Sequence, residues 1–251
     1  MAEAIIVESV TKSFKLANHQ TIKRLAVNAV KRRPLSRTFT ALEDISFKLQ
    51  QGESIGLMGL NGSGKSTLLK MISGVMSPDR GQVLTRGRIA GLIEVGAGFH
   101  PELSGRENIY LNGAILGMSE GEIDAKFDAI VEFSEMRQFL DSEVRHYSSG
   151  MFMRLAFAVA VHTECDIFLI DEVLAVGDQP FRRKCLARIQ ELRDEGRTLV
   201  FVSHSAKQVQ RVCTRGIVLT KGKVAFEGTS GEAVRYLGYE TEDETDEAND
   251  D

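Results

Sequence analysis

Residues 59–66 carry the side chains and the spacing needed for phosphate chemistry. They read G-L-N-G-S-G-K-S, which fits the pattern G-x-x-x-x-G-K-[ST], and they lie between an apolar run at 54–58 and a helix-like run at 67–72. A strand, a glycine-rich turn and a helix start aim backbone N–H groups and a positive helix end at one point, which suits a triphosphate. Lys65 would reach the β- and γ-phosphates, and Ser66 would ligate Mg²⁺. A glycine-rich turn that only caps a helix is the alternative, but it leaves Lys65 and Ser66 without a role.

Two adjacent acids follow another apolar run. Residues 167–170 read I-F-L-I, and Asp171 and Glu172 come directly after them. A buried strand in this form delivers carboxylates to a site at its carboxyl end. Asp171 would hold Mg²⁺, directly or through water, and Glu172 could take a proton from the attacking water. The alternative is an ordinary turn at a strand end.

Small polar residues and a histidine add two further candidates. His204 follows Ser203 and the apolar run 198–202, where we expect a γ-phosphate contact, although a structural histidine is the alternative. Ser148, Ser149 and Gly150 open a helix-like run to residue 161. A helix N-terminus with hydroxyls is a second anion site, or simply a helix cap.

The surrounding pattern predicts an α/β fold whose sheet is mostly parallel, because strands alternate with helices along the chain. Strands are expected at 5–8, 45–49, 54–58, 82–84, 89–95, 167–170, 198–202, 217–220 and 223–226, with the last two forming a hairpin. Helices are expected at 67–72, 105–116, 120–133, 150–161, 181–195 and 206–213. We expect one domain over 1–239, with a core at about 1–95 and 162–230 and a helical subdomain at about 96–161.

A basic segment interrupts the N-terminal strands. Residues 15–37 contain seven lysines and arginines and no acid. Apolar residues recur there at helical spacing from Ile22 to Val30, which predicts a short basic amphipathic helix in an insert at about 18–34. Its basic face could be solvated, or it could contact an anionic membrane surface or a membrane partner. Nucleic acid is a weaker reading, because no interleaved aromatic residues support base stacking.

Composition narrows the class of protein. The 251 residues are 43% hydrophobic, and the three cysteines are widely spaced without a C-x-x-C pair, so we expect reduced thiols and neither disulfides nor a zinc site. No signal peptide or apolar run of membrane-spanning length is evident. We therefore expect a cytoplasmic protein whose membrane function would need a partner chain. The acidic tail at 240–251 is expected to be disordered.

The order of these pieces resembles that of ABC transporter ATPase subunits, up to about residue 235. Y-S-S-G-M at 147–151, I-E-V-G-A-G-F-H-P-E-L-S-G-R-E-N at 93–108 and the basic helix before Phe39 resemble the branch that exports polysaccharides. That branch moves lipid-linked O-antigen, capsule, teichoic acid or galactan across bacterial inner membranes. The resemblance implies a P-loop NTPase fold with antiparallel N-terminal strands and an all-helical signature subdomain, and it implies ATP and Mg²⁺ as ligands.

The resemblance also implies roles for individual residues. Phosphate and Mg²⁺ would be held by Gly59, Leu60, Asn61, Gly62, Ser63, Gly64, Lys65, Ser66 and Thr67. Asp171 would hold Mg²⁺, Glu172 would be the general base and His204 would sense the γ-phosphate. Phe14 matches the aromatic residue that stacks on adenine, with Phe39 as a rival.

Other positions depart from the family pattern or act across a dimer. Glu94 stands where the family has a glutamine near water and Mg²⁺, and Ser149 and Met151 replace a glycine and a glutamine of the signature. Ser148 and Gly150 would contact the γ-phosphate held by the opposite subunit. Asp178 resembles a residue of the loop that links the two sites.

The resemblance thus implies the ATPase of an exporter for lipid-linked polysaccharide. Two copies would close around two MgATP on two copies of a transmembrane permease, at the cytoplasmic face of the inner membrane. An importer of a small solute would use the same ATPase. A soluble ABC protein acting on nucleic acid or ribosomes is less favoured, because the chain has one phosphate loop and no sustained heptads.

Overall fold

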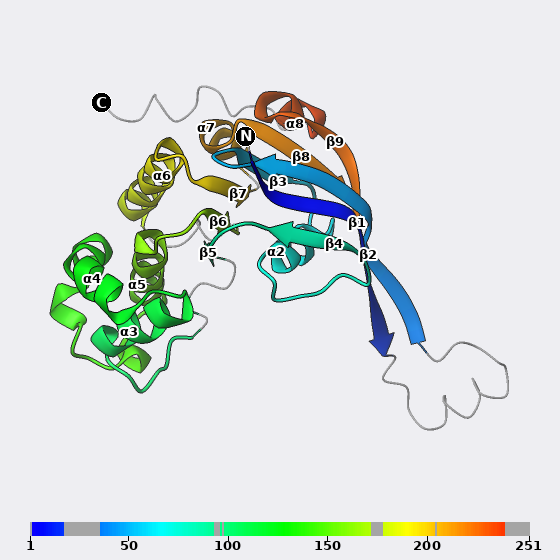
Figure 1. The fold of residues 1–251 in the computed structure, drawn as a ribbon. Coiled ribbons are helices and arrows are strands. Elements are labelled where there is room, and N and C mark those ends of the chain that lie inside the picture. The colour runs from blue at the N-terminus through cyan, green and yellow to red at the C-terminus, as the bar shows by residue number, and fades with distance from the viewer. Residues whose placement is uncertain are drawn as a thin grey trace, which may run out of the picture.

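A six-stranded sheet forms the centre of the molecule (Figure 1). The computed structural model describes residues 2–17, 36–92, 96, 98–171, 178–203 and 205–238. The strands are ordered β5 (Ile89–Leu92), β6 (Ile167–Ile170), β7 (Thr198–Val202), β3 (Ser54–Met58), β8 (Arg215–Thr220) and β9 (Lys223–Thr229). Neighbours are parallel except β8 and β9, which form an antiparallel hairpin. The predicted α/β class and mostly parallel sheet are confirmed.

The central strands are continuous apolar runs because both faces of the sheet are covered. Every residue of β3, β6 and β7 is buried. On one face lies α2 (Lys65–Ile72), whose Leu68 and Leu69 share a core with β3 and with the N-terminal strands. On the other face lie α6 (Gln179–Asp194), α7 (Ala206–Val212) and α8 (Ser230–Tyr236).

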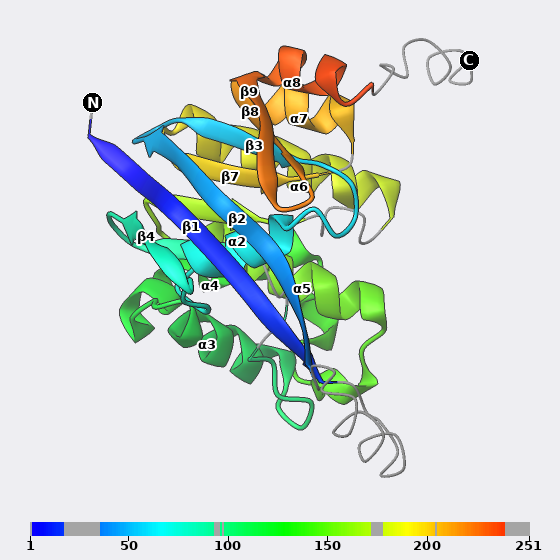
Figure 2. The ribbon, with the colours of Figure 1, turned by 90° about the vertical axis from the view of Figure 1, so that its right-hand side faces the viewer.

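A second, antiparallel sheet has the order β2 (Ser36–Gln50), β1 (Glu3–Ala17) and β4 (Arg80–Thr85). β1 and β2 pair along their whole lengths, from Glu3 opposite Gln50 to Ala17 opposite Ser36. Their far ends project from the body as a two-stranded arm (Figures 1 and 2). Both strands are much longer than expected from the sequence, because beyond the pair Lys12 and Leu42 the pairing continues through residues 13–15 and 38–40, which are exposed or only partly buried. The predicted basic helix lies outside the described residues.

Three helices between β5 and β6 form a group with its own core. They are α3 (Gly105–Ile115), α4 (Glu120–Ser134) and α5 (Ser149–His162), with short 3-10 turns η1 (Arg137–Phe139) and η2 (Val144–His146) between α4 and α5. Ser104 and Ser119 begin α3 and α4 as capping boxes. Arg88, just before β5, ties this group to the sheet through an ion pair with Glu122 at 3.1 Å. Backbone N–H donation from Ser119, followed by the Arg88 contact, lowers the pKa of Glu122 to about 2.

The three cysteines are buried and free, as predicted. Burial raises the pKa of the Cys165 thiol to about 11 and that of Cys185 to about 12, and it raises the pKa of Cys213 as well. All three are therefore unreactive thiols at neutral pH. Among the described residues, no helix is both long enough and apolar enough to span a bilayer.

Candidate nucleotide-binding site

The loop between β3 and α2 has a backbone that only glycine accommodates at two positions. Gly59 has φ +140°, and a Cβ there would lie 2.2 Å from the carbonyl oxygen of Leu219. Gly64 has φ +108°, and its Cβ would lie 2.8 Å from the carbonyl oxygen of Ala41. A Cβ on Gly62 would meet nothing within 4 Å, so this glycine faces open space. The loop is packed against β2 and β8 on one side and open on the other.

Lys65, the first residue of α2, is held inside this loop. Its side chain is buried, with the residue 7% exposed, and Nζ donates to the carbonyl oxygens of Gly59 at 2.7 Å and Leu60 at 3.1 Å. Nearby, the Ser63 Oγ is buried with no hydrogen-bond partner among the described residues. An ammonium group and an unsatisfied hydroxyl on one turn suit an anionic oxygen-rich ligand.

A pocket of about 220 Å³ opens from the loop and brings together several of the predicted ligand-binding residues. It is lined by Phe14, Phe39, Ala41, Asn61, Gly62, Gly64, Lys65, Ser66, Thr67 and Asp171. We call it the phosphate-loop pocket. Asp171 reaches it from the end of β6, because β6 and β3 flank β7 in a parallel arrangement and end at the same edge of the sheet.

Two aromatic rings form the far wall of the phosphate-loop pocket. Phe14 of β1 lies directly opposite Phe39 of β2 in the antiparallel register, so both side chains emerge on one face. Phe39 is 48% exposed, and the Lys12 ammonium lies 6.0 Å from the centre of the Phe14 ring. The two rivals for the stacking position are therefore neighbours in the same pocket.

The remaining predicted site residues are either elsewhere or not described. Ser148 caps α5, with its Oγ accepting from the Met151 N–H at 3.1 Å, and Ser148 and Ser149 are exposed. A Cβ on Gly150 would meet only the Ser148 Oγ, at 3.8 Å. None of these three residues lines the phosphate-loop pocket. Glu94, Glu172 and His204 lie outside the described residues.

Asp178 lies at the start of α6 and forms an ion pair with Arg154, which the sequence analysis did not predict. Its Oδ1 accepts from Nη2 of Arg154 at 2.6 Å, and Nη1 of Arg154 donates to Oε2 of Glu135 at 2.6 Å. Our reading of the sequence missed Arg154 and Glu135. The available signal was Arg154 itself, the one lysine or arginine in the mostly apolar α5.

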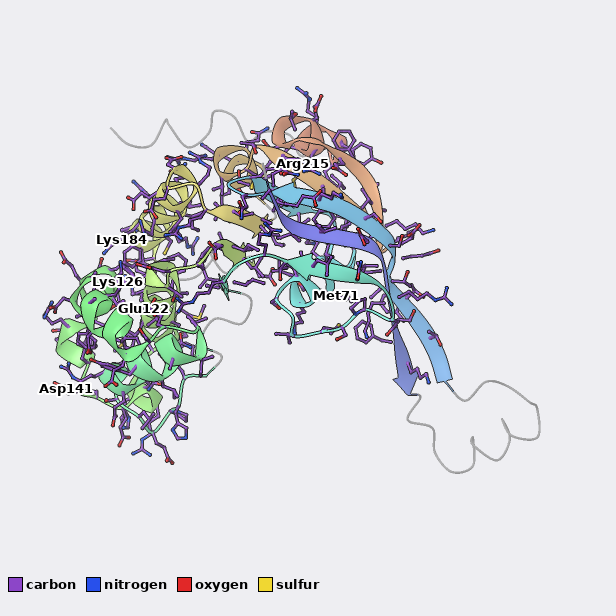
Figure 3. All side chains as sticks on the ribbon, viewed as in Figure 1. Met71, Glu122, Lys126, Asp141, Lys184 and Arg215 are labelled. Carbon is purple, nitrogen blue, oxygen red and sulfur yellow. The ribbon has the colours of Figure 1, made fainter. Side chains whose placement is uncertain are left out.

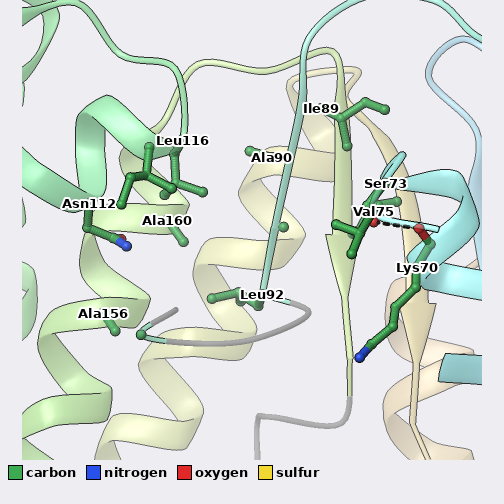
Figure 4. Close-up of a pocket in the computed structure, with 14 residues that line it drawn as sticks. Lys70, Ser73, Val75, Ile89, Ala90, Leu92, Asn112, Leu116, Ala156 and Ala160 are labelled. Atoms are coloured by element: carbon green, nitrogen blue, oxygen red, sulfur yellow. Dashed lines mark hydrogen bonds between the residues drawn. The ribbon is translucent and has the colours of Figure 1, made fainter. Parts of the chain in front are cut away.

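A second, apolar pocket lies between the sheet and the helical group (Figure 4). We call it the apolar pocket; its volume is about 280 Å³. One wall contains Lys70 of α2 with Ser73 and Val75, which follow this helix, and the opposite wall contains Asn112 and Leu116, with β5 between them. Val75 is 74% exposed, and Ile115, which also lines this pocket, is 56% exposed.

Comparison with known proteins agrees with this geometry. The family model described as "ABC transporter" matches residues 42–175. The O-antigen export system ATP-binding protein RfbB of Klebsiella pneumoniae is 46% identical over 86% of this chain and 89% of its own. The chain belongs to the ABC transporter ATPase family. Hydrolysis of ATP is the activity of this enzyme class.

Other relatives of this ABC ATPase are longer than the matched region. The ABC transporter protein AbcA of Aeromonas salmonicida is 45% identical over 91% of this chain and 74% of its own length. The teichoic acids export ATP-binding protein TagH of Listeria monocytogenes is 43% identical over 79% of this chain but only 59% of its own. This chain matches 54% of the length of the O-antigen export system ATP-binding protein RfbB of Myxococcus xanthus, at 44% identity.

Solved structures support the same fold. An ATP-binding subunit of an ABC transporter superposes with a TM-score of 0.74 at 24% identity, covering 94% of this chain and 93% of that one. A dimeric ATP-binding cassette in a post-hydrolysis state, bound to ADP and Pi, superposes with a TM-score of 0.72 at 22% identity, covering 90% and 98%. The predicted P-loop NTPase fold is confirmed.

Proposed function

We propose that this ABC ATPase powers export of a lipid-linked polysaccharide across the inner membrane of a bacterium, together with a separate transmembrane subunit. The observation that carries the ATPase part is the phosphate-loop pocket, which joins Lys65, Ser66 and Asp171 to an aromatic wall. The substrate class rests on the names of the relatives, which are ATP-binding proteins of O-antigen and teichoic acid export.

The residues present in the phosphate-loop pocket fit Mg²⁺ as the metal ion. Ser66 and Asp171 line the same pocket and supply the hard oxygen donors that Mg²⁺ prefers, and Glu94 is a third proposed ligand. When bound, Mg²⁺ neutralises charge that develops on the phosphate oxygens.

The chain's own side chains then account for the rest of the hydrolysis reaction. Lys65 and the loop residues 59–67 hold the phosphates, and the open backbone at Gly62 leaves room for them. Phe14 or Phe39 stacks on the adenine ring. Glu172 accepts a proton from the attacking water, and His204 contacts the γ-phosphate.

A second copy of the chain completes the site on this proposal. Ser148, Ser149 and Gly150 are accessible at a helix N-terminus but do not line their own chain's pocket. In a homodimer around two ATP molecules, each α5 start would face the nucleotide held by the other copy, and Asp178 would lie near the junction.

The transmembrane subunit is proposed to insert a short segment into the apolar pocket. Val75 and Ile115 are large apolar side chains left exposed at its rim, which is typical of a surface that a partner covers. The pocket lies between the nucleotide-holding sheet and the helical group, so a segment seated there would move when the two shift. The chain would then work peripherally at the cytoplasmic face, with the basic segment near anionic lipid and no nucleic acid partner.

The proposal is tested in the source bacterium by deleting the gene and complementing it with variants. We expect the deletion to leave lipid-linked polymer inside the cell, wild-type chain to restore surface polymer, and Lys65→Ala to fail. Lys126→Ala is the matched control, since Lys126 pairs only with Glu164 on the surface at 3.4 Å among the described residues. Undiminished surface polymer in the deletion strain would contradict the proposed function.

A further inference from the structure

Arg154 connects three parts of the molecule that are far apart in sequence. It belongs to the second turn of α5, and its guanidinium bridges Glu135 at the end of α4 and Asp178 at the start of α6, each at 2.6 Å. The same guanidinium lies 4.8 Å from the centre of the Phe181 ring of α6. Its side chain is 22% exposed, so the two ion pairs are partly shielded from water.

Glu135 is held in an uncommon backbone conformation at this junction. It ends α4 with φ +61°, a left-handed geometry usually taken there by glycine or asparagine. Its other carboxylate oxygen accepts from Lys184 of α6 at 3.2 Å, and Lys184 also donates to the Phe133 carbonyl oxygen at 2.9 Å. In Figure 3 Lys184 lies where α6 meets the helical group. Partial burial opposes ionisation of Glu135, but the Lys184 and Arg154 contacts outweigh it and lower its pKa.

Asp178 does not cap α6 with its side chain, although it directly precedes this helix. An aspartate before a helix normally accepts a hydrogen bond from a backbone N–H of the first turn. Asp178 occupies the N-cap of α6 and makes no such bond; its carboxylate turns to Arg154 instead. The direction of the chain at Asp178 is thus tied to α5 as well as to α6.

We propose that Arg154 is a positioning residue that fixes Asp178, and with it the start of α6, to α5 close behind its N-cap Ser148. The inference rests on the proposed function for its consequence in catalysis. Any displacement of the α5 start by a nucleotide would reach Asp178 through one side chain, because Arg154 lies only four residues beyond Gly150.

Ion pairs at this level of exposure contribute little to stability, so the role is geometric. Arg188 supplies a matched control. Its side chain is also 22% exposed and also contacts two carboxylates, those of Glu191 at 3.0 Å and Glu195 at 2.9 Å. Arg188, Glu191 and Glu195 all belong to α6 or its C-terminal cap. Arg188 therefore has the charge and exposure of Arg154, but among the described residues it makes no ion pair with α4 or α5.

The test is hydrogen–deuterium exchange on the full-length chain without nucleotide, comparing wild type, Arg154→Gln and Arg188→Gln. Peptides covering 132–137 and 178–184 should exchange about two- to fivefold faster in Arg154→Gln. They should be unchanged in Arg188→Gln, and Arg154→Lys should fall between. Equal exchange in Arg154→Gln and Arg188→Gln would overturn the proposal. If Arg154→Gln fails to fold, Asp178→Ala must give the same faster exchange at 132–137, and its absence would overturn the proposal equally.

Steady-state ATPase assays on the same proteins separate this inference from the proposed function. For a positioning residue, Arg154→Gln should lower kcat several-fold and leave the KM for ATP within about twofold. Combining it with Asp178→Ala should add no further loss. Kinetics equal to those of Arg188→Gln would show that Arg154 positions nothing the reaction uses. A wild-type chain without ATPase activity would refute the proposed function. The exchange data would still show whether Arg154 holds Glu135 and Asp178 in place.

Discussion

The phosphate loop and the start of α5 are both turns at helix N-termini that we propose to bind phosphate, but they differ in burial and in their hydrogen bonds. The loop packs against two sheets, Lys65 is buried within it and the Ser63 hydroxyl has no hydrogen-bond partner in the described part of the chain. Ser148 and Ser149 are exposed, and the Ser148 hydroxyl is satisfied by its own helix. The phosphate loop is thus already shaped as a binding site within its own chain, whereas the start of α5 is an accessible surface.

This difference suggests how the two turns share the work. Lys65 Nζ is buried and is held by carbonyl oxygens of the loop, and keeping an ammonium there costs free energy that an anionic ligand would lower, so the loop suits such a ligand. An exposed helix start has no such cost and can meet a ligand brought by another molecule. The phosphate-loop side should therefore control binding and chemistry, and the α5 side should control assembly.

The largest expected effect is on the phosphate-loop side. Glu172→Gln removes the proposed general base, so turnover should fall by about 10² to 10⁴ while ATP binding is kept. Single-turnover hydrolysis and equilibrium binding of labelled ATP measure the two properties separately. A wild-type rate in this variant would refute the assignment of the base.

A smaller loss is expected at the α5 start. Ser148→Asp keeps an oxygen that can cap α5 but places a negative charge towards a phosphate, so turnover should fall roughly ten- to a hundredfold. The melting temperature should stay near that of wild type. Ser119→Asp, at the cap of α4, is the control and should leave turnover unchanged. If both variants behave alike, the α5 start has no special role.

The aromatic wall should affect affinity alone. Replacing the ring that stacks on adenine with alanine should raise the KM for ATP about tenfold, and replacing the other should change it less. Phe14→Ala and Phe39→Ala, measured singly and together, identify which ring stacks. An unchanged KM for ATP in the double variant would show that the adenine ring stacks on neither Phe14 nor Phe39.

The smallest effect on the isolated enzyme is expected from the basic segment. Neutralising Lys23, Arg24, Lys31, Arg32 and Arg33 together should leave the ATPase rate of the purified chain within about twofold, yet impair export. Neutralising Lys207 and Arg211 on α7 is the control, with no effect on either. Normal export in the first variant would show that the basic segment is a solvated surface without a role in export.

The sequence predicted the elements that depend on local pattern. β3, β6 and β7 have the predicted bounds because each is an apolar run buried on both faces. α8 was missed because it is short, although Thr229 and Glu232 form a capping box that signals its start. The length of β1 and β2 was missed because the sequence there shows no apolar alternation; strand pairing and contacts such as that of Lys12 with Asp79 extend the two strands.

In the candidate site too, residues set by local spacing were predicted, whereas contacts between residues far apart in the sequence were not. Motif spacing predicted Lys65, Ser66 and Asp171, because a strand, loop and helix start constrain them locally, and the phosphate-loop pocket brings them together. The Arg154 contacts join residues separated by 19 and 24 positions, which no local spacing encodes. The roles of all predicted site residues stay predictions, and Glu94, Glu172 and His204 lie outside the described residues.

The central claim, that each site combines the loop of one copy with the α5 start of another, is tested by mixing two inactive chains. Lys65→Ala and Ser148→Asp chains are unfolded together, refolded at equal amounts and assayed for ATPase activity. Half of the dimers would then contain one site with both lesions and one intact site, so the mixture should recover about a quarter of wild-type activity. Activity no greater than the sum of the two separate variants would show that the loop and the α5 start do not meet across a dimer.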